Sequence, residues 1–154
     1  DPVAGNRLEI RAVFEWDDAE EFGLVVCCSP GGEEQTQIRF NANPNHYYRR
    51  EIPPLRELVL DVTRSSTRPD INNRESQRCH AAHAAGEPVE LRVFIDRSVV
   101  EVFVNGGRYY LAERIYPARP DSVGVRFFAR GGKATLRSLD AWQMKAIWPL
   151  EENG

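Results

Sequence analysis

Apolar and polar residues alternate along most of the chain, and this period of two is its dominant pattern. In segment 8–16, every second residue is apolar and most of the residues between them are charged. Such alternation predicts a half-buried β-strand, because successive side chains of a strand point to opposite faces. Similar β-rich runs predict further strands at 22–29, 35–40, 57–63, 89–96, 99–104, 108–115, 122–129, 134–139 and 141–148.

Turn-forming residues separate these segments, as in the sequences SPGG at 29–32 and NGG at 105–107. Glycine and asparagine accept a positive φ and proline fixes φ, so such clusters are typical of tight turns. Many short strands joined in this way predict an all-β fold, either an antiparallel sandwich or a barrel. Residues 64–88 form the longest stretch without a strand pattern, and we expect an irregular loop there, with one helical turn within 75–85.

Length and charge narrow the class of protein. The 154 residues are 42% hydrophobic and carry a formal net charge of −3. We expect one domain over residues 1–149 and a frayed acidic tail at 150–154. Without a strong positive field, nucleic acid and membrane surfaces are not expected partners, and no apolar run approaches the about 20 residues of a membrane span. The start lacks both Met and a leader pattern, so we interpret the chain as cut from a longer protein.

The three cysteines exclude a disulfide scaffold, because their number is odd and Cys27 and Cys28 are adjacent. Unpaired thiols favour a reducing, bacterial cytoplasmic setting, with a secreted parent protein as the open alternative. Cys79, His80 and His83 are of metal-ligand type. Their spacing does not give two separated ligand pairs, and Cys27 and Cys28 as strand neighbours would point to opposite faces. We therefore expect no metal and no other cofactor.

No group of residues builds a recognisable catalytic site. The acidic pairs at 20–21 and 33–34 lie in expected turns, where we expect solvated carboxylates with ordinary pKa values. The three histidines, His46, His80 and His83, fall in expected loops. The sequence has neither a Gly-x-Ser-x-Gly nucleophile elbow nor a glycine-rich phosphate loop. The sequence thus predicts no catalytic residue.

The segment 90–108 predicts a hairpin whose two faces are both partly apolar. If its alternating Leu, Val and Ile residues enter the core, the opposite face carries Phe94, Phe103 and, from segment 122–129, Phe128. Rings interleaved with charges of both signs are typical of a half-buried face. We therefore expect these three phenylalanines to dock against another domain, and to support self-association when the chain is isolated.

Two tyrosine pairs offer a second kind of surface. In two neighbouring strand residues one ring points inward and the other outward, so each pair predicts one core ring and one surface ring. A surface ring can stack on a sugar. Tyr48, Tyr109 and Tyr110 are therefore candidate glycan-stacking residues, with ordinary packing as the alternative.

The sequence VFIDRSVVEVFVNGGR at 93–108, continued by RIYP at 114–117, resembles the C-terminal β-sandwich module of glycoside hydrolase family 32. That family contains invertases, levanases, inulinases and other β-fructosidases. Further matches follow in order: LEI at 8–10, EFGL at 21–24, LDVTRSS at 60–66 and LRSLDAWQM at 136–144. The resemblance implies an antiparallel two-sheet β-sandwich of the concanavalin-like or jelly-roll type. It also implies a parent enzyme with an N-terminal five-bladed propeller that holds the active site.

The family's catalytic motifs do not occur in this sequence. The nucleophilic Asp of the Trp-Met-Asn-Asp-Pro-Asn-Gly-like motif, the Glu of Glu-Cys and the Asp of Arg-Asp-Pro are all missing, so no residue is carried over as catalytic. The resemblance implies a turn at 96–98 with short side chains bonding to the backbone. It also implies an ion pair, either across the strands or at a domain interface, for the charged signature residues Glu101 and Arg114 on neighbouring strands. The signature positions with such structural roles are Asp96, Arg97, Ser98, Glu101, Phe103, Asn105 and Arg114.

The resemblance and the missing motifs lead to one expectation for function. We expect a non-catalytic module, inactive alone, that docks against and stabilises the propeller of a β-fructosidase acting on sucrose, levan or inulin. The alternative is a carbohydrate-binding module that holds fructan or another glycan through the tyrosines.

Overall fold

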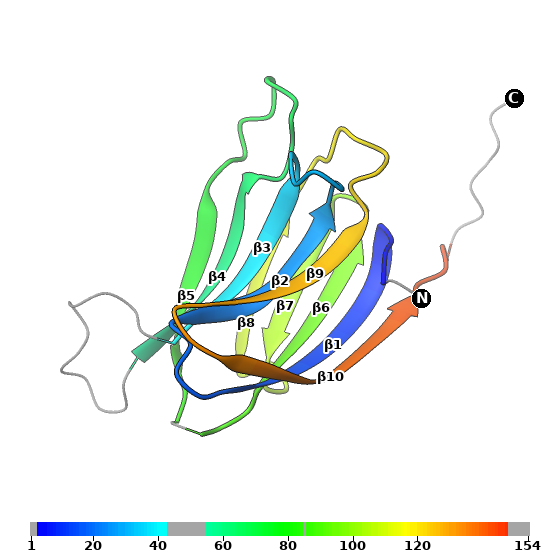
Figure 1. Ribbon diagram of the computed structural model, residues 1–154. Coiled ribbons are helices and arrows are strands. Elements are labelled where there is room, and N and C mark those ends of the chain that lie inside the picture. The colour runs from blue at the N-terminus through cyan, green and yellow to red at the C-terminus, as the bar shows by residue number, and fades with distance from the viewer. Residues whose placement is uncertain (1–2, 43–54, 85, 148–154) are drawn as a thin grey trace, which may run out of the picture.

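Two five-stranded antiparallel sheets pack face to face in the computed structural model, which describes residues 3–42, 55–84 and 86–147 (Figure 1). The strands are β1 (Arg7–Trp16), β2 (Glu21–Cys28), β3 (Gln35–Asn41), β4 (Leu55–Arg64), β5 (Ser76–Ala82), β6 (Val89–Asp96), β7 (Val99–Val104), β8 (Tyr109–Arg114), β9 (Gly124–Arg130) and β10 (Ala134–Gln143). The first sheet has the order β10-β1-β6-β7-β8 and the second β5-β4-β3-β2-β9. The predicted all-β sandwich is thus confirmed. No helix within the described ranges has the length and apolar character to cross a membrane.

The core lies between the two sheets and follows the alternation of the sequence. In β6, Leu91, Val93 and Ile95 are fully buried, while the residues between them face outward. The two sheets contribute alternate residues in this way, as expected for strands with one face on a core. The residues between these buried positions form the outer, solvent-facing surface of the first sheet.

β5 corrects the prediction for residues 64–88. Where an irregular loop with a helical turn was expected, Ser76–Ala82 form a strand that pairs along one side with β4. Its sequence SQRCHAA is largely polar and only Ala81 is buried, so it shows little of the alternation that is typical of a half-buried strand. The strand is defined by its main-chain pairing with β4, which the pattern of its side chains does not indicate.

The end of the chain differs from the prediction in a second way. The two strands predicted at 134–139 and 141–148 form one strand, β10, which ends at Gln143. β10 pairs with β1, and a shift in register between Val13 and Phe14 keeps the apolar residues of β10 facing the core. The predicted tail at 150–154 lies outside the described residues.

Gly23 allows β2 and β3 to approach closely. Its φ is +155°, and a Cβ atom built there would lie 2.0 Å from the carbonyl oxygen of Ile38. No side chain fits that space, so the pairing of these strands requires glycine at this position.

Candidate functional site

A row of aromatic rings crosses the outer face of the first sheet. The register of β6, β7 and β8 places Phe103 opposite Tyr110 and diagonally next to Phe94. The ring centroids of Phe103 and Tyr110 are 4.8 Å apart, and those of Phe94 and Phe103 are 5.9 Å apart, edge to face. Phe94 and Phe103 are half-buried and Tyr110 is 48% exposed. We call Phe94, Phe103 and Tyr110 the aromatic row.

Charged groups border the aromatic row. The guanidinium of Arg92 lies 5.5 Å from the Phe94 ring centre and pairs with the carboxylate of Glu9. The Tyr110 hydroxyl donates a 2.7 Å hydrogen bond to Glu101 Oε1. That hydrogen bond, with desolvation and the negative charge of Glu101, raises the pKa of Tyr110. Rings and paired charges thus share the surface, as the alternation predicted.

Trp142 extends this face to the opposite edge of the sheet. It lies in β10 opposite Glu9, which in turn lies opposite Phe94 across β1 and β6. Its side chain is 49% exposed. Large half-exposed rings therefore occur on β10, β6, β7 and β8 of one sheet face.

Phe128 does not belong to this face, which corrects the predicted docking group. It lies in β9 of the second sheet, opposite Gly23, with the Arg130 guanidinium 4.6 Å from its ring centre. The sequence predicted that Phe128 shares a face with Phe94 and Phe103 from local alternation alone. Long-range pairing decides which sheet a strand joins, and the pairing of β9 with β2 puts Phe128 on the other sheet.

The candidate stacking tyrosines have separate places in the fold. Tyr110 is the exposed member of its pair, whereas Tyr109 is half-buried and packs against the core. The Tyr109 hydroxyl donates a 2.8 Å hydrogen bond to the carbonyl oxygen of Ala82, which links β8 to the end of β5. Tyr109 is thus engaged as a packing residue. Tyr48 lies outside the described residues.

The signature turn between β6 and β7 is fastened by main-chain groups. Arg97 has a φ of +53°, and its amide donates to the carbonyl oxygen of Asn6 at 2.7 Å. The carbonyl oxygen of Ser98 accepts from the Ile115 amide at 2.9 Å. Asp96, at the end of β6, lies opposite Val99. The turn therefore connects three segments of the chain through its backbone, where side-chain hydrogen bonds were expected.

Asn105 closes the next turn through its side chain. With a φ of +47°, it accepts a 2.7 Å hydrogen bond from the Glu90 amide on Oδ1. Its Nδ2 donates to the carbonyl oxygen of Pro88 at 3.0 Å. Asn is one of the few non-glycine residues that adopt this backbone conformation readily. The Asn105 side chain thus holds the turn after β7 against the start of β6, which explains why this signature position is Asn.

Glu101 and Arg114 do not form the cross-strand ion pair that was one of the two alternatives implied by the resemblance, whereas an ion pair at a domain interface stays a prediction. Glu101 lies opposite Ala112 and binds the Tyr110 hydroxyl. Arg114 lies opposite Val99, and its carbonyl oxygen accepts from Asn73 Nδ2 at 2.7 Å. Glu101 is therefore part of the aromatic face rather than one half of a pair with Arg114.

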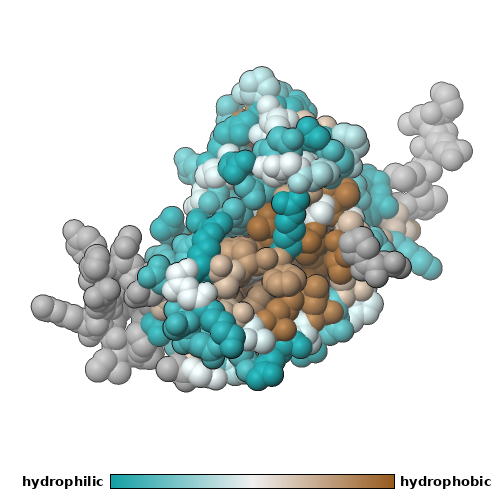
Figure 2. Space-filling model, in the orientation of Figure 1, coloured by the Kyte–Doolittle hydropathy of each residue, from teal (hydrophilic) through white to brown (hydrophobic). Residues whose placement is uncertain are grey.

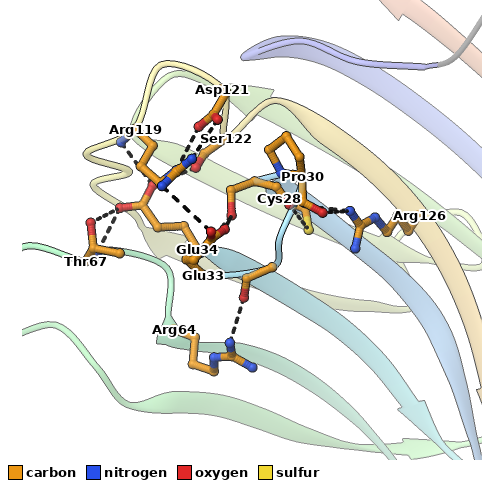
Figure 3. A network of polar contacts seen from close by, with 12 residues as sticks. Cys28, Pro30, Glu33, Glu34, Arg64, Thr67, Arg119, Asp121, Ser122 and Arg126 are labelled. Carbon is orange, nitrogen blue, oxygen red and sulfur yellow. Dashed lines mark hydrogen bonds and ion pairs between the residues drawn. The ribbon is translucent and has the colours of Figure 1, made fainter.

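Glu34 is an ordered residue that sequence reasoning missed, because it was expected to be a solvated turn carboxylate. Its side chain is buried and accepts hydrogen bonds from the Thr67 amide and hydroxyl, the Ala118 and Arg119 amides and the Ser122 hydroxyl, at 2.6 to 3.1 Å (Figure 3). Burial alone raises the pKa, but these hydrogen bonds outweigh it and lower the pKa of Glu34 to about 2. A buried carboxylate thus joins three loops at one end of the sandwich.

Cys27, Cys28 and His83 are buried in this fold. Cys27 and Cys28 are both buried, because a bulge at Cys27 (φ +48°) changes the alternation of β2. Burial, with the neighbouring Cys28 thiol, raises the pKa of Cys27 to about 12. His83 lies in the loop after β5, as expected, and its side chain is buried, with its ring 5.2 Å from that of Phe40. The prediction of a loop is wrong for His80, which lies in β5, and His46 is outside the described residues. Within the ranges that the structure describes, no three His, Cys, Asp or Glu residues gather as a metal site.

The fold and its outer face define an all-β sandwich with an aromatic surface and without a recognisable catalytic motif. The family described as Glycosyl hydrolases family 32 C terminal matches residues 1–143. The chain therefore belongs to glycosyl hydrolase family 32, as its C-terminal domain.

Relatives in sequence and structure are longer proteins. A fructan 1-exohydrolase of Leymus chinensis is 36% identical over 138 residues, which are 86% of this chain and 22% of the relative. Fructan 1-exohydrolase w3 of Triticum aestivum is 35% identical, with the same shares. Fructan 1-exohydrolase IIa from Cichorium intybus superposes with a TM-score of 0.78 at 22% identity, over 93% of this chain and 32% of that one. Exo-inulinase from Aspergillus awamori superposes with a TM-score of 0.72 at 24% identity, over 95% of this chain and 26% of that one. This chain thus spans about a fifth of these curated relatives, and the solved structures share its fold.

Proposed function

We propose that the chain is the non-catalytic C-terminal module of a β-fructosidase, and that it docks against and stabilises the catalytic propeller of that enzyme. Two facts support the proposal: the family, and the small share of the relatives that the chain spans. Hydrolysis with retention needs two carboxyl groups about 5 to 5.5 Å apart across the scissile bond. None of the family motifs that supply those groups occurs in this sequence. The chemistry is therefore assigned to the rest of the parent enzyme.

The observation that carries this proposal is the aromatic row with its bordering charges. Interfaces between folded domains are enriched in aromatic residues and arginine, with polar groups at the rim. Phe94, Phe103 and Tyr110 present such a surface, and Arg92 and Glu101 already have partners next to the rings. A partner can cover these rings while Arg92 keeps its ion pair with Glu9 and Glu101 keeps its hydrogen bond from Tyr110.

The test compares one substitution in two settings. Phe103→Ser removes the central ring of the row, and its effect on thermal unfolding is measured in the isolated chain and in the parent enzyme. We expect an additional loss of about 1–2 kcal/mol in the parent, because there the ring also loses its partner. Fructose release per folded enzyme should change little.

Phe128→Ser is the matched control, since Phe128 is a half-buried phenylalanine on the outer face of the other sheet. It should destabilise the chain and the parent equally. Equal losses in both settings for Phe103→Ser as well would refute docking through the aromatic row.

Glycan binding is the second candidate function, and a hollow of about 240 Å³ on the same face favours it. Phe94 and Phe103 line the hollow together with Arg92 and Glu90. A ring beside hydrogen-bonding groups suits a sugar. Titration of the chain with levan, inulin and short fructo-oligosaccharides, followed by Trp fluorescence, separates the two functions. Saturable quenching of Trp fluorescence that Phe103→Ser abolishes, without release of fructose, would favour glycan binding. No change in fluorescence would favour docking against the propeller.

A further inference from the structure

One end of the outer face of the first sheet bears a group of cationic side chains. Arg7 lies opposite Asp96 across β1 and β6, and Arg114 is the last residue of β8. Arg97 lies in the turn between β6 and β7, and Lys145 follows the end of β10. We call Arg7, Arg97, Arg114 and Lys145 the cationic end.

The cationic end has no carboxylate partners of its own. Elsewhere on this protein exposed arginines are paired, as Arg92 is with Glu9 and Arg130 with Glu21. Within the ranges that the structure describes, none of the four side chains of the cationic end has an ion pair or a hydrogen bond. Asp96 brings one negative charge to this end of the sheet. Four cations against one carboxylate leave an excess of positive charge, which attracts an acidic partner.

The backbone of Arg97 indicates that its side chain has a partner outside the chain. Its φ of +53° is a conformation that glycine adopts freely and that residues with a Cβ atom adopt at a cost. The turn needs only main-chain groups, because the Arg97 amide bonds to the carbonyl oxygen of Asn6. Glycine would keep this bond and remove the cost. The arginine is therefore accounted for by a contact that its guanidinium makes with another part of a larger protein.

A hollow of about 550 Å³ lies among these cations. Arg7, Arg97 and Lys145 line it, and so do Val99 and Ile147. Val99 is 37% exposed and Ile147 is 89% exposed. Arginine binds a carboxylate through paired hydrogen bonds, and exposed apolar side chains gain from burial. The hollow thus fits a carboxylate that stands beside an apolar side chain.

The hollow lies close to the point where a preceding part of the parent polypeptide would enter the domain. The Met144 amide donates to the carbonyl oxygen of Arg7 at 3.0 Å, and Gln143 Nε2 donates to that of Ala4 at 2.7 Å. The start of β1 and the end of β10 therefore lie side by side (Figure 1). A partner that is covalently attached next to Ala4 has a high effective concentration at the hollow, which a separate protein lacks.

We propose that the cationic end binds a carboxylate-bearing segment of the catalytic part of the parent enzyme. This inference rests on the proposed function and adds the charge of the surface that docks. Asp96 and Phe94 lie on the same face of β6, so the cationic end and the aromatic row form one continuous surface. By contrast, the apolar residues gathered between the free edges of β9 and β10 (Figure 2) do not select a partner by charge.

The two lysines of the chain allow a direct test. Lys145 belongs to the cationic end, whereas Lys133 precedes β10, at the far end of that strand. The acetylation rate of each lysine is measured by mass spectrometry in the isolated chain and in the parent. We expect Lys145 to react at least about 10-fold more slowly in the parent, because its contact must open before the amine reacts. The side chain of Lys133 is 74% exposed and should react at the same rate in both proteins.

Arg97→Gly should have opposite effects on stability in the two proteins. In the isolated chain, glycine suits the positive φ, so the unfolding temperature should stay the same or rise. In the parent, the unfolding temperature should fall by at least about 2 °C, because the carboxylate loses its partner. This loss should shrink in about 1 M salt, which screens charges. Arg78→Ala is the control: it removes an exposed arginine of β5, in the other sheet, and should act equally in both proteins.

Other results would overturn the proposal. Equal acetylation of Lys145 in the isolated chain and the parent would show that the catalytic part does not cover the cationic end. Slowing in the isolated chain that grows with protein concentration would assign the contact to a second copy. Slowing by added inorganic phosphate, without slowing in the parent, would assign it to a free anion.

The failure of this proposal and the failure of docking through the aromatic row give different results. An additional loss for Phe103→Ser in the parent, with Lys145 unprotected, would retain docking and reject the cationic contact. A protected Lys145, with equal losses for Phe103→Ser in both settings, would retain the cationic contact and reject the aromatic row.

Discussion

Phe103 and Tyr110 lie directly opposite each other on β7 and β8, and the Tyr110 hydroxyl returns to β7 by its hydrogen bond to Glu101. One tyrosine thus contacts both a ring and a carboxylate of the neighbouring strand. The aromatic row is held in place by this combination, before any partner covers it.

The first prediction concerns the titration of Tyr110. The hydrogen bond to Glu101 raises the Tyr110 pKa, so the contribution of this contact to stability is present below the ordinary pKa of tyrosine and is lost as pH rises through the raised value. Glu101→Ala should return the pKa toward its ordinary value of 10.0. Tyrosinate absorbance against pH measures this. An unchanged titration in Glu101→Ala would show that Tyr110 is not bonded to Glu101 in solution.

The second prediction concerns Glu34→Gln. Gln keeps the size of the side chain but removes the charge, and its NH2 group replaces one of the two oxygens, so that donors face either the Ala118 or the Arg119 amide. We expect a loss of about 2–3 kcal/mol in the free energy of unfolding, measured with urea. Glu75→Gln changes an exposed glutamate and should have little effect. Similar small losses for both variants would contradict the role given to Glu34.

The third prediction is the acid stability of the chain. The pKa of Glu34 falls from its ordinary value of 4.5 to about 2 in the folded chain. Its contribution is therefore complete above about pH 4.5 and disappears as pH falls toward 2. The difference in unfolding free energy between the natural chain and Glu34→Gln should narrow over this window. A difference that stays constant from neutral pH to pH 2 would be inconsistent with an ionised Glu34.

The fourth prediction separates two roles of glycine. Gly23→Ala forces a Cβ atom against the carbonyl oxygen of Ile38, so β2 and β3 must move apart. We expect a loss of about 3 kcal/mol or more. Gly106→Ala meets open space at a φ of +69° and should cost about 1 kcal/mol, for its backbone conformation alone. Thermal unfolding of both variants gives the comparison, and equal losses would show that the strands adjust without cost.

The fifth prediction concerns Asn105. Asn105→Gly keeps the positive φ and loses the side-chain hydrogen bonds, whereas Asn105→Ala loses both. We expect Asn105→Ala to be the more destabilising by about 1 kcal/mol, in chemical denaturation. The reverse order would indicate that the turn after β7 changes conformation in the variants.

Local alternation was sufficient to predict most strands, because their inner residues are apolar and their outer residues charged. β5 was not predicted because SQRCHAA is an edge strand with little buried surface. Phe128 was assigned to the wrong face because the pairing of β9 with β2, about a hundred residues away, decides its sheet. The burial of Glu34 was not predicted for the same physical reason, since its hydrogen-bond partners Thr67 and Ser122 come from distant loops. The aromatic row was predicted in part: Phe94 and Phe103 from alternation, and Tyr110 as a separate stacking residue.

The pairing of β1 with β10 has a consequence for synthesis on the ribosome. β1 lies between β6 and β10, so its second ladder is made with the last strand of the domain. Until Gln143 has left the exit tunnel, one side of β1 stays without its partner, and the emerging domain exposes the unpaired main-chain donors and acceptors of that edge. Contacts between strands so distant in sequence form slowly. The domain therefore completes its fold after translation of β10, and chaperones that bind nascent chains should associate with it until then.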